Sequence, residues 1–318
     1  MTWLTWRQHR SVVTVALILL VGMALFITII GWQMRHDAQS LASSACAHPG
    51  GCPDILAAQT DTITVFHNVT LMLLFVPVLI GVFIGAPLIA REYEQQTYKT
   101  AWTQSITRSR WLGAQVALLF AGTLVMSGIL SALVAWADYG TLDQRYTLWA
   151  FDLSAIVPVS YATFALALGL AAGALLQRTL PAIGITLAGY LAIRLPILSS
   201  LRSHYMSPLT AIGDLVDPQN WQPSAPNGNT DWILEQGFVQ GGHRYPSGIK
   251  IPSYCEFSPG QSAMQLNACL QAHGWSAYTI YQPADRFWMF QGIESVIFFG
   301  LTAALVALTI WWVRRRLV

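Results

Sequence analysis

The residues whose types and spacing suit a specific interaction lie in one polar segment, residues 91–111, with the sequence REYEQQTYKTAWTQSITRSRW. Three apolar residues recur at every fourth position and would share one face of a short helix: Tyr98, Trp102 and Ile106. Acidic residues precede this stripe and basic residues follow it, in the order that a helix macrodipole favours: Glu92, Glu94, Arg108 and Arg110. The pattern predicts a surface helix that presents a face to a partner. The alternative is a solvated loop without one.

Motifs for covalent chemistry are missing from the sequence. It has no Gly-x-x-x-x-Gly-Lys-Ser/Thr phosphate loop, no His-Glu-x-x-His and no Gly-x-Ser-x-Gly. We therefore expect no catalytic residue, no metal and no cofactor in this chain. The remaining basis for a membrane-embedded enzyme is a set of histidines and one carboxylate on the predicted outer side of the membrane: His67, His204, His243 and Asp214.

Composition indicates an integral membrane protein. The chain is 54% hydrophobic and only 10% charged, against about 25% charged residues in soluble domains. A net charge of +2 gives no reason to expect nucleic acid as a partner. We therefore expect the lipid bilayer to be a partner of this chain.

Six apolar runs are long enough to cross a bilayer as helices: residues 11–32, 69–90, 112–136, 153–176, 180–198 and 287–313. The second and fourth carry glycine pairs at a spacing that lets membrane helices approach closely: Gly81 with Gly85, and Gly169 with Gly173. Residues 1–10 combine Trp3 and Trp6 with Arg7 and Arg10, which predicts a short interfacial helix.

These runs predict an all-α polytopic fold in three parts. Residues 1–198 would hold helices 1–5, residues 199–286 a large polar block, and residues 287–318 helix 6 with a basic end. The block is rich in Pro, Gly and Asn and is expected to be partly irregular, with helical candidates at 263–273 and 208–216.

Orientation follows from the basic residues, which favour the cytoplasmic side. With both termini inside, the cytoplasmic side receives ten of the 17 Lys and Arg, and its only acidic residues are Glu92 and Glu94. The polar segment would then be cytoplasmic, and the block at 199–286 extracellular.

All four cysteines fall on the predicted outer side, where disulfides persist. Three pairings are possible, and Cys46–Cys52 with Cys255–Cys269 is the most local of them. The rival interpretation is a metal site, because His48 lies between Cys46 and Cys52. The close double Cys-x-x-Cys spacing of structural zinc sites is missing, which favours disulfides.

Two ionisable residues lie inside the predicted helices, Arg194 in helix 5 and Glu294 in helix 6. Counted from the inner ends, both would lie in the outer part of the bilayer. One interpretation is a charge pair that joins the two helices at the outer mouth of a pathway. The other is that each side chain reaches the headgroups independently.

The polar segment resembles the coupling region between helices 2 and 3 of ABC-2-type transporter permeases, in the compact form common in actinobacteria. That motif runs roughly R-E-x-E-x-x-T and then a-W-T-Q-S-x-T-R-x-R-W. The matching residues here are Arg91, Glu92, Glu94, Thr97, Ala101, Trp102, Thr103, Gln104, Ser105, Thr107, Arg108, Arg110 and Trp111. A second match, YQPADRFW at 281–288, enters helix 6 and is followed by Gln291 and Glu294.

The resemblance implies a membrane subunit without an ATPase of its own, in the bacterial plasma membrane. A separate ATPase subunit would bind ATP and Mg, and a second permease copy would complete a homodimer, with helix 5 facing its mate. By carry-over, the residues that couple to the ATPase would be Arg91, Glu92, Glu94, Thr97, Trp102, Gln104, Arg108 and Arg110.

Such permeases usually export hydrophobic or amphipathic compounds, such as drugs, antibiotic peptides or lipid-like molecules. The block at 199–286 is larger than the short helices typical of the family, which suggests an additional outer lid or recognition element. The alternative functions are a sensor or assembly subunit that does not transport, and the membrane-embedded enzyme considered above.

Overall fold

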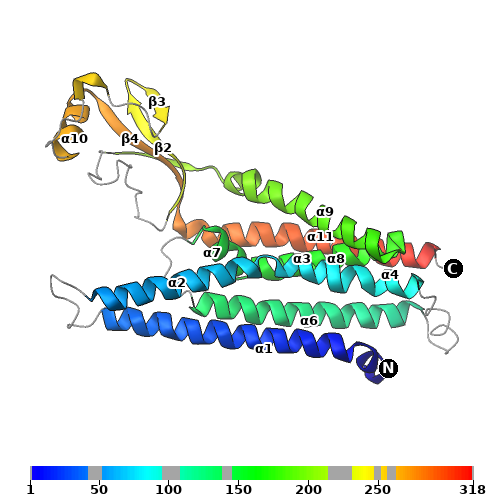
Figure 1. Cartoon of the computed structure of the whole chain (residues 1–318). Coiled ribbons are helices and arrows are strands. Elements are labelled where there is room, and N and C mark those ends of the chain that lie inside the picture. The colour runs from blue at the N-terminus through cyan, green and yellow to red at the C-terminus, as the bar shows by residue number, and fades with distance from the viewer. Residues whose placement is uncertain are drawn as a thin grey trace. The chain divides into compact units, whose positions relative to one another are not determined.

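The computed structural model describes residues 2–41, 52–94, 108–137, 145–213, 231–246, 252–255 and 263–316. The chain divides into two compact units. The first comprises Met1–Leu142, Leu148–Ile197 and Gln291–Val318, and the second comprises Asp143–Thr147 and Leu198–Phe290. The first unit is helical, and the second contains a β-sheet (Figure 1).

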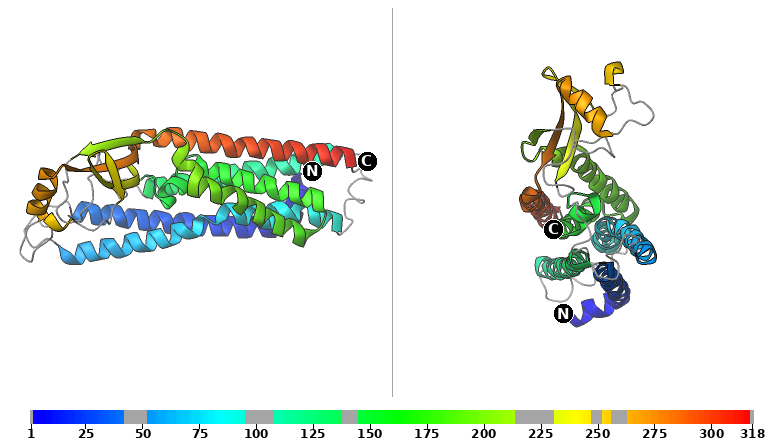
Figure 2. Two further views of the ribbon diagram at one scale, coloured as in Figure 1. Left: turned by 90° about the horizontal axis from the view of Figure 1, so that it is seen from above. Right: turned by 90° about the vertical axis from the view of Figure 1, so that its left-hand side faces the viewer.

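The helices of the first unit lie side by side as a bundle, as the view along their length shows (Figure 2, right). Their bounds are α1 Thr2–Leu41, α2 Pro53–Leu73, α3 Val76–Ile80, the π-helical turn η2 Gly81–Gly85, α4 Ala86–Glu94, α6 Arg108–Ala137, α7 Leu148–Leu153, α8 Val157–Leu176 and α9 Thr179–Pro196. Helix α11, Phe287–Arg316, contributes all but its first turn to this unit.

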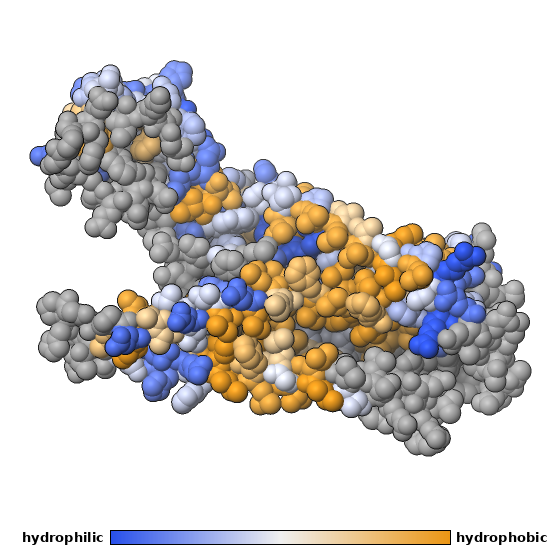
Figure 3. Space-filling model, viewed as in Figure 1, coloured by the Kyte–Doolittle hydropathy of each residue, from blue (hydrophilic) through white to orange (hydrophobic). Residues whose placement is uncertain are grey.

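Six helical stretches of the described chain are long and apolar enough to cross a membrane, in agreement with the predicted number. They are Ile18–Leu41, Asp54–Glu94, Val116–Ala137, Val157–Leu176, Thr179–His204 and Ala284–Arg315. Apolar residues cover much of the visible face of the helices (Figure 3). Large apolar side chains on several helices are exposed, among them Leu19, Phe83 and Val296. This surface suits contact with lipid.

The first two helices are longer than predicted. Helix α1 runs without a break from Thr2 past residue 32 to Leu41, and α2 starts at Pro53 rather than near residue 69. Residues 33–41 and 53–68, which lie between the first two predicted apolar runs, are therefore helical as well. The stretch Asp54–Glu94 has 41 residues. As a helix it measures about 60 Å, twice the hydrocarbon thickness, so part of it extends beyond the bilayer core.

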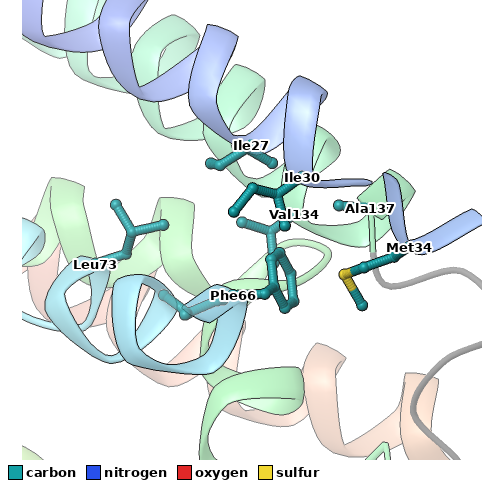
Figure 4. Close-up of a cluster of buried hydrophobic side chains, with 8 residues drawn as sticks. Ile27, Ile30, Met34, Phe66, Leu73, Val134 and Ala137 are labelled. Atoms are coloured by element: carbon teal, nitrogen blue, oxygen red, sulfur yellow. The ribbon is translucent and has the colours of Figure 1, made fainter. Parts of the chain in front are cut away.

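One hydrophobic cluster joins α1, α2, α6 and α7, and Figure 4 shows most of its side chains. Its buried members are Ile27, Ile30, Met34, Phe66, Leu73, Val134, Ala137 and Leu153. Phe66 comes from α2 residues that the sequence pattern assigned to a loop. Burial of its ring anchors this part of α2 against α1 and α6.

The two glycine pairs predicted from the sequence pack against each other. A Cβ atom added to Gly169 on α8 would lie 2.3 Å from the carbonyl oxygen of Gly81 in η2, and one on Gly173 would lie 2.5 Å from that of Ala86. These distances leave no room for any side chain. Glycine thus lets α8 lie backbone to backbone against η2 and α4, and α8 is the most buried of the six candidate spans.

The second unit is built on a four-stranded antiparallel sheet with the order β1-β4-β2-β3. Its strands are β1 Leu209–Gly213, β2 Trp232–Gln240, β3 His243–Pro246 and β4 Trp275–Gln282. Helix α10, Ala263–Ala272, buries Leu266 and Leu270 in one cluster with Trp275. The short helical turns in and next to this unit are η3 Ile197–Leu201, η4 Arg202–His204, η6 Ser253–Cys255 and η7 Ala284–Arg286.

The all-α prediction is therefore wrong for the block at 199–286. Within the helical candidate at 208–216, residues Leu209–Gly213 form strand β1 instead, whose partner β4 lies far along the chain, and residues 214–216 lie outside the described residues. The candidate at 263–273 is confirmed by α10.

We expect Gly169→Ala to lower the free energy of unfolding by about 1–3 kcal/mol, because the added methyl group meets rigid backbone rather than a flexible side chain. The control is Gly128→Ala on α6, where a Cβ atom has no neighbour within 4 Å. Thermal unfolding in detergent should separate the two variants. Equal stability would contradict the close backbone packing.

Candidate functional site

A cluster of charged side chains is buried within the helical unit. The guanidinium of Arg194 on α9 donates from Nη2 to Oδ2 of Asp152 on α7, and from Nη1 to Oε1 of Glu294 on α11 at 3.1 Å. Tyr161 on α8 donates its hydroxyl proton to Oε1 of Glu294, and its ring lies 4.1 Å beneath the guanidinium. Four helices thus meet at one ionic group.

A break between α7 and α8 places Asp152 in this cluster. Ala155 in the break has a left-handed backbone, with φ of 60°. The side chain of Gln291 on α11 donates from Nε2 to the carbonyl of Phe151 (2.8 Å), and its Oε1 accepts from the N–H of Val157 (3.1 Å). Ser131 on α6 donates to the carbonyl of Ala155 (2.7 Å). Inside a bilayer such a break is tolerated only where its backbone groups find partners in the protein, as these do.

The three ionisable side chains of this cluster are all buried. Arg194, Asp152 and Glu294 are 8%, 3% and 0% exposed, and one guanidinium faces two carboxylates. Burying ions is costly, and hydrogen bonds to each ion offset only part of that cost. Ionisable groups kept at membrane depth despite this cost are functional candidates.

The structure brings the predicted pair, Arg194 and Glu294, into direct contact. Their role at the outer mouth of a pathway stays a prediction. The sequence analysis missed Asp152, because this residue directly precedes the apolar run that starts at Leu153 and was assigned to a loop. The available signal was its position between apolar residues in the stretch Leu148–Leu153.

Among the predicted coupling residues, Glu94 makes the best defined contact. At the end of α4, its Oε1 accepts from the N–H of Thr179 at 2.9 Å and its Oε2 accepts from Oγ1 of Thr179 at 2.6 Å. Thr179 is the first residue of α9, so Glu94 satisfies a free N–H at a helix N-terminus, where negative charge is favoured.

The other predicted coupling residues are less fully defined. Arg91 is exposed and Glu92 is half-buried on α4. Thr97, Trp102 and Gln104 lie outside the described residues, and for Arg108 and Arg110 the structure describes only their place in the first turn of α6.

The second unit contains the predicted Cys255–Cys269 disulfide, with a Cα–Cα distance of 5.8 Å. Cys52 is also disulfide-bonded, and its predicted partner Cys46 lies outside the described residues. The two sulfurs of Cys255 and Cys269 lie close enough to Nδ1 of His273 for the three to share a metal ion. While Cys255 and Cys269 form a disulfide, however, neither sulfur is a thiolate that could bind a metal ion. Nδ1 of His273 also lies within hydrogen-bond distance of the carbonyl oxygen of Cys269, at 2.8 Å. The rival site proposed from His48 falls outside the described residues.

The residues considered for an enzyme lie on separate elements. His67 is on α2, His204 is in η4 with Nδ1 2.7 Å from the carbonyl of Ser200, and His243 is an exposed residue of β3. Asp214 lies outside the described residues.

A different titratable contact stabilises the sheet of the second unit. Tyr278 on β4 is buried and donates to Oε1 of Glu235 on β2 at 2.5 Å. This hydrogen bond to a carboxylate, together with burial, raises the pKa of Tyr278. The contact joins two strands, so we assign it a role in folding.

Residues 17–202 match the family described as ABC-2 membrane transporter related. This range covers more than half of the chain and includes the segment at 91–111 and the helices that carry Arg194 and Asp152. The chain belongs to this family and is a multi-pass membrane subunit of an ABC transporter. Neither the curated proteins nor the solved structures gave a match.

We expect the cluster to tolerate loss of one carboxylate better than loss of its cation. Arg194→Leu leaves two buried carboxylates without their cation and should cost about 3–5 kcal/mol of stability. Asp152→Asn and Glu294→Gln each keep a side chain of similar size that can still accept a hydrogen bond from Arg194, and should cost less.

The measurement is thermal unfolding in detergent. Leu195→Ala is the control, because this neighbour of Arg194 on α9 is 55% exposed. If Arg194→Leu were as stable as the control, the cluster would have no role in stability.

Proposed function

We propose that this chain is the permease subunit of an ATP-driven exporter. A separate ATPase subunit would bind ATP and Mg, and the permease would move a hydrophobic or amphipathic compound out of the cell. The family match carries this proposal, because it includes the polar segment at 91–111 that resembles a coupling region. The lack of a phosphate loop in the sequence supports an ATPase on another subunit.

The proposed orientation has both termini in the cytoplasm of a bacterium. The contact between Glu94 and Thr179 supports one part of it, because it brings the end of α4 and the α8–α9 turn to the same end of the bundle. The predicted topology requires the end of α4 and the α8–α9 turn to lie on the same side of the membrane. The basic residues of that end and of residues 314–316 favour the cytoplasmic side.

The transporter would contain two copies of this chain. On α9 the small residues Gly184, Ala188 and Ala192 recur at every fourth position and are exposed. Small residues at this spacing let membrane helices approach closely, so α9 is the helix that we expect to face its mate.

Affinity capture from the native membrane in mild detergent tests the proposal. We expect an ATP-binding subunit to be recovered near one to one with the tagged chain. Trp102→Ala should reduce this recovery about tenfold or more, because a buried aromatic residue at an interface commonly contributes 2 kcal/mol or more to binding. Trp32→Ala, which alters an exposed tryptophan on α1, is the control.

Capture of the chain alone in several detergents would count against the transporter. A complex that hydrolyses ATP in vesicles but moves no hydrophobic dye would favour the non-transporting sensor instead. The sheet of the second unit would then be the candidate ligand-binding part.

Ala188→Cys tests the proposed pairing of α9. Oxidation in the membrane should link two chains of 35.0 kDa each through this position. Leu118→Cys on α6 is the control, since Leu118 is also exposed but lies on another helix. Linkage through Leu118→Cys and not through Ala188→Cys would place the subunit interface elsewhere.

A further inference from the structure

Helix α9 is held by polar contacts at both ends. One side of the helix is buried along its whole length, through residues spaced by four: Ala182, Thr186, Tyr190 and Arg194. The first residue of α9 bonds to α4 and Arg194 in its last turn bonds to α7 and α11. The two contacts are separated by about 22 Å along the helix axis.

The contact at the first residue joins α9 to the polar segment. Both carboxylate oxygens of Glu94 are used on Thr179, one on the backbone N–H and one on the hydroxyl. Glu94 is the last residue of α4, and the rest of the segment follows it directly. Figure 1 shows the end of α4 and the start of α9 at the same end of the bundle. A displacement of the segment would therefore act on α9 through this contact.

The contact at the far end resists continuous sliding. A buried guanidinium needs charged partners wherever it stands, because its desolvation is costly. Arg194 can thus occupy only positions in which carboxylates accept its hydrogen bonds. In this structure Asp152 and Glu294 fill that role, from two different helices. A helix anchored in this way moves between discrete positions rather than gradually.

The side of α9 that faces α8 offers few obstacles to such a step. A Cβ atom on Gly189 would meet only the flexible end of Leu168, at 3.3 Å. The rings of Tyr190 and Phe164 stack with their centroids 6.1 Å apart. These side-chain contacts allow α9 to slide along its axis past α8. The backbone contact at Gly169, in contrast, holds α8 at one position against η2.

We propose that α9 transmits movement of the polar segment to the buried charge cluster. This inference rests on the proposed transport function. Glu94 and Thr179 are positioning residues of this link. The main partner of Glu94 is then α9 itself, and the residues that bind the ATPase lie further along the segment.

The experiment measures movement of α9 in the captured complex, reconstituted in nanodiscs. Spin labels are placed at Ile185→Cys on α9 and Leu118→Cys on α6, both exposed. Labelled chains are diluted with unlabelled chains, so that distances within one chain dominate. The distance between labels is measured without nucleotide and with ATP and vanadate.

Glu94→Gln and Thr179→Val weaken the contact from its two sides. The matched controls are Asp61→Asn and Thr64→Val on α2, where Asp61 is exposed and the Thr64 hydroxyl bonds only to its own helix, at the carbonyl of Thr60. Unfolding temperature is recorded for every variant, and Thr179→Val serves alone if Glu94→Gln does not fold.

We expect nucleotide to shift the distance in the parent complex and in both controls. Glu94→Gln and Thr179→Val should each lose most of this shift while still capturing the ATPase subunit near one to one. The double variant should lose no more than either single variant, because both changes act on one contact.

Two results would overturn the inference. One is that both variants keep the full shift. The other is that Glu94→Gln loses the ATPase subunit while Thr179→Val keeps both the subunit and the shift, which would make Glu94 a direct contact to the ATPase. Failure of the parent chain to capture any ATPase subunit would instead refute the proposed function, and this inference with it.

Discussion

The helical unit depends on the close backbone contact between α8 and the η2–α4 stretch. Lipid tails are as apolar as leucine, so membrane helices associate through packing and polar contacts rather than through exclusion of water. At Gly169 and Gly173 the two backbones lie so close that no side chain fits between them, since an added Cβ atom would lie within 2.5 Å of a carbonyl oxygen. With α8 fixed in this way, its remaining surface can receive α6, α7 and α9, and Tyr161 is held where the charges meet.

The charge cluster and the break before α8 support each other. The break frees backbone groups that need partners, and Gln291 and Ser131 supply them. In return the break places Asp152 beside Arg194, so that carboxylates from two different helices bind the same guanidinium. Removing either feature would leave buried polar groups without compensation, a cost that is higher in hydrocarbon than in a soluble core.

The sequence was sufficient for features that depend on local composition. Apolar runs predicted six spans, and the spacing of the glycine pairs predicted a close approach of helices. The sheet was missed because its pairing is not local. Strand β1 has five residues and pairs with β4, and neither its length nor its residues distinguish it from a short helix. The central strand β4, WSAYTIYQ, did carry a signal in its aromatic and β-branched residues.

Asp152 was missed for a related reason. Hydropathy locates helices by their apolar residues, so an acidic residue beside an apolar run is assigned to water. The break at Ala155 reverses this assignment, and it depends on Gln291, more than a hundred residues away. The predicted roles of Glu94 and the segment came from a resemblance, and geometry alone gives Glu94 a partner within the same chain.

Helix α9 brings the proposed functions into one element while keeping them on separate faces. Successive residues of an α-helix turn by about 100°, so positions two apart lie nearly opposite each other. The buried series ends at Arg194 and the exposed small series ends at Ala192, two residues before it. No side chain therefore belongs to both. Because both faces share one rigid backbone, a change in the position of Arg194 would displace the exposed face as well. The charge cluster and the proposed subunit interface would then be coupled through the helix itself.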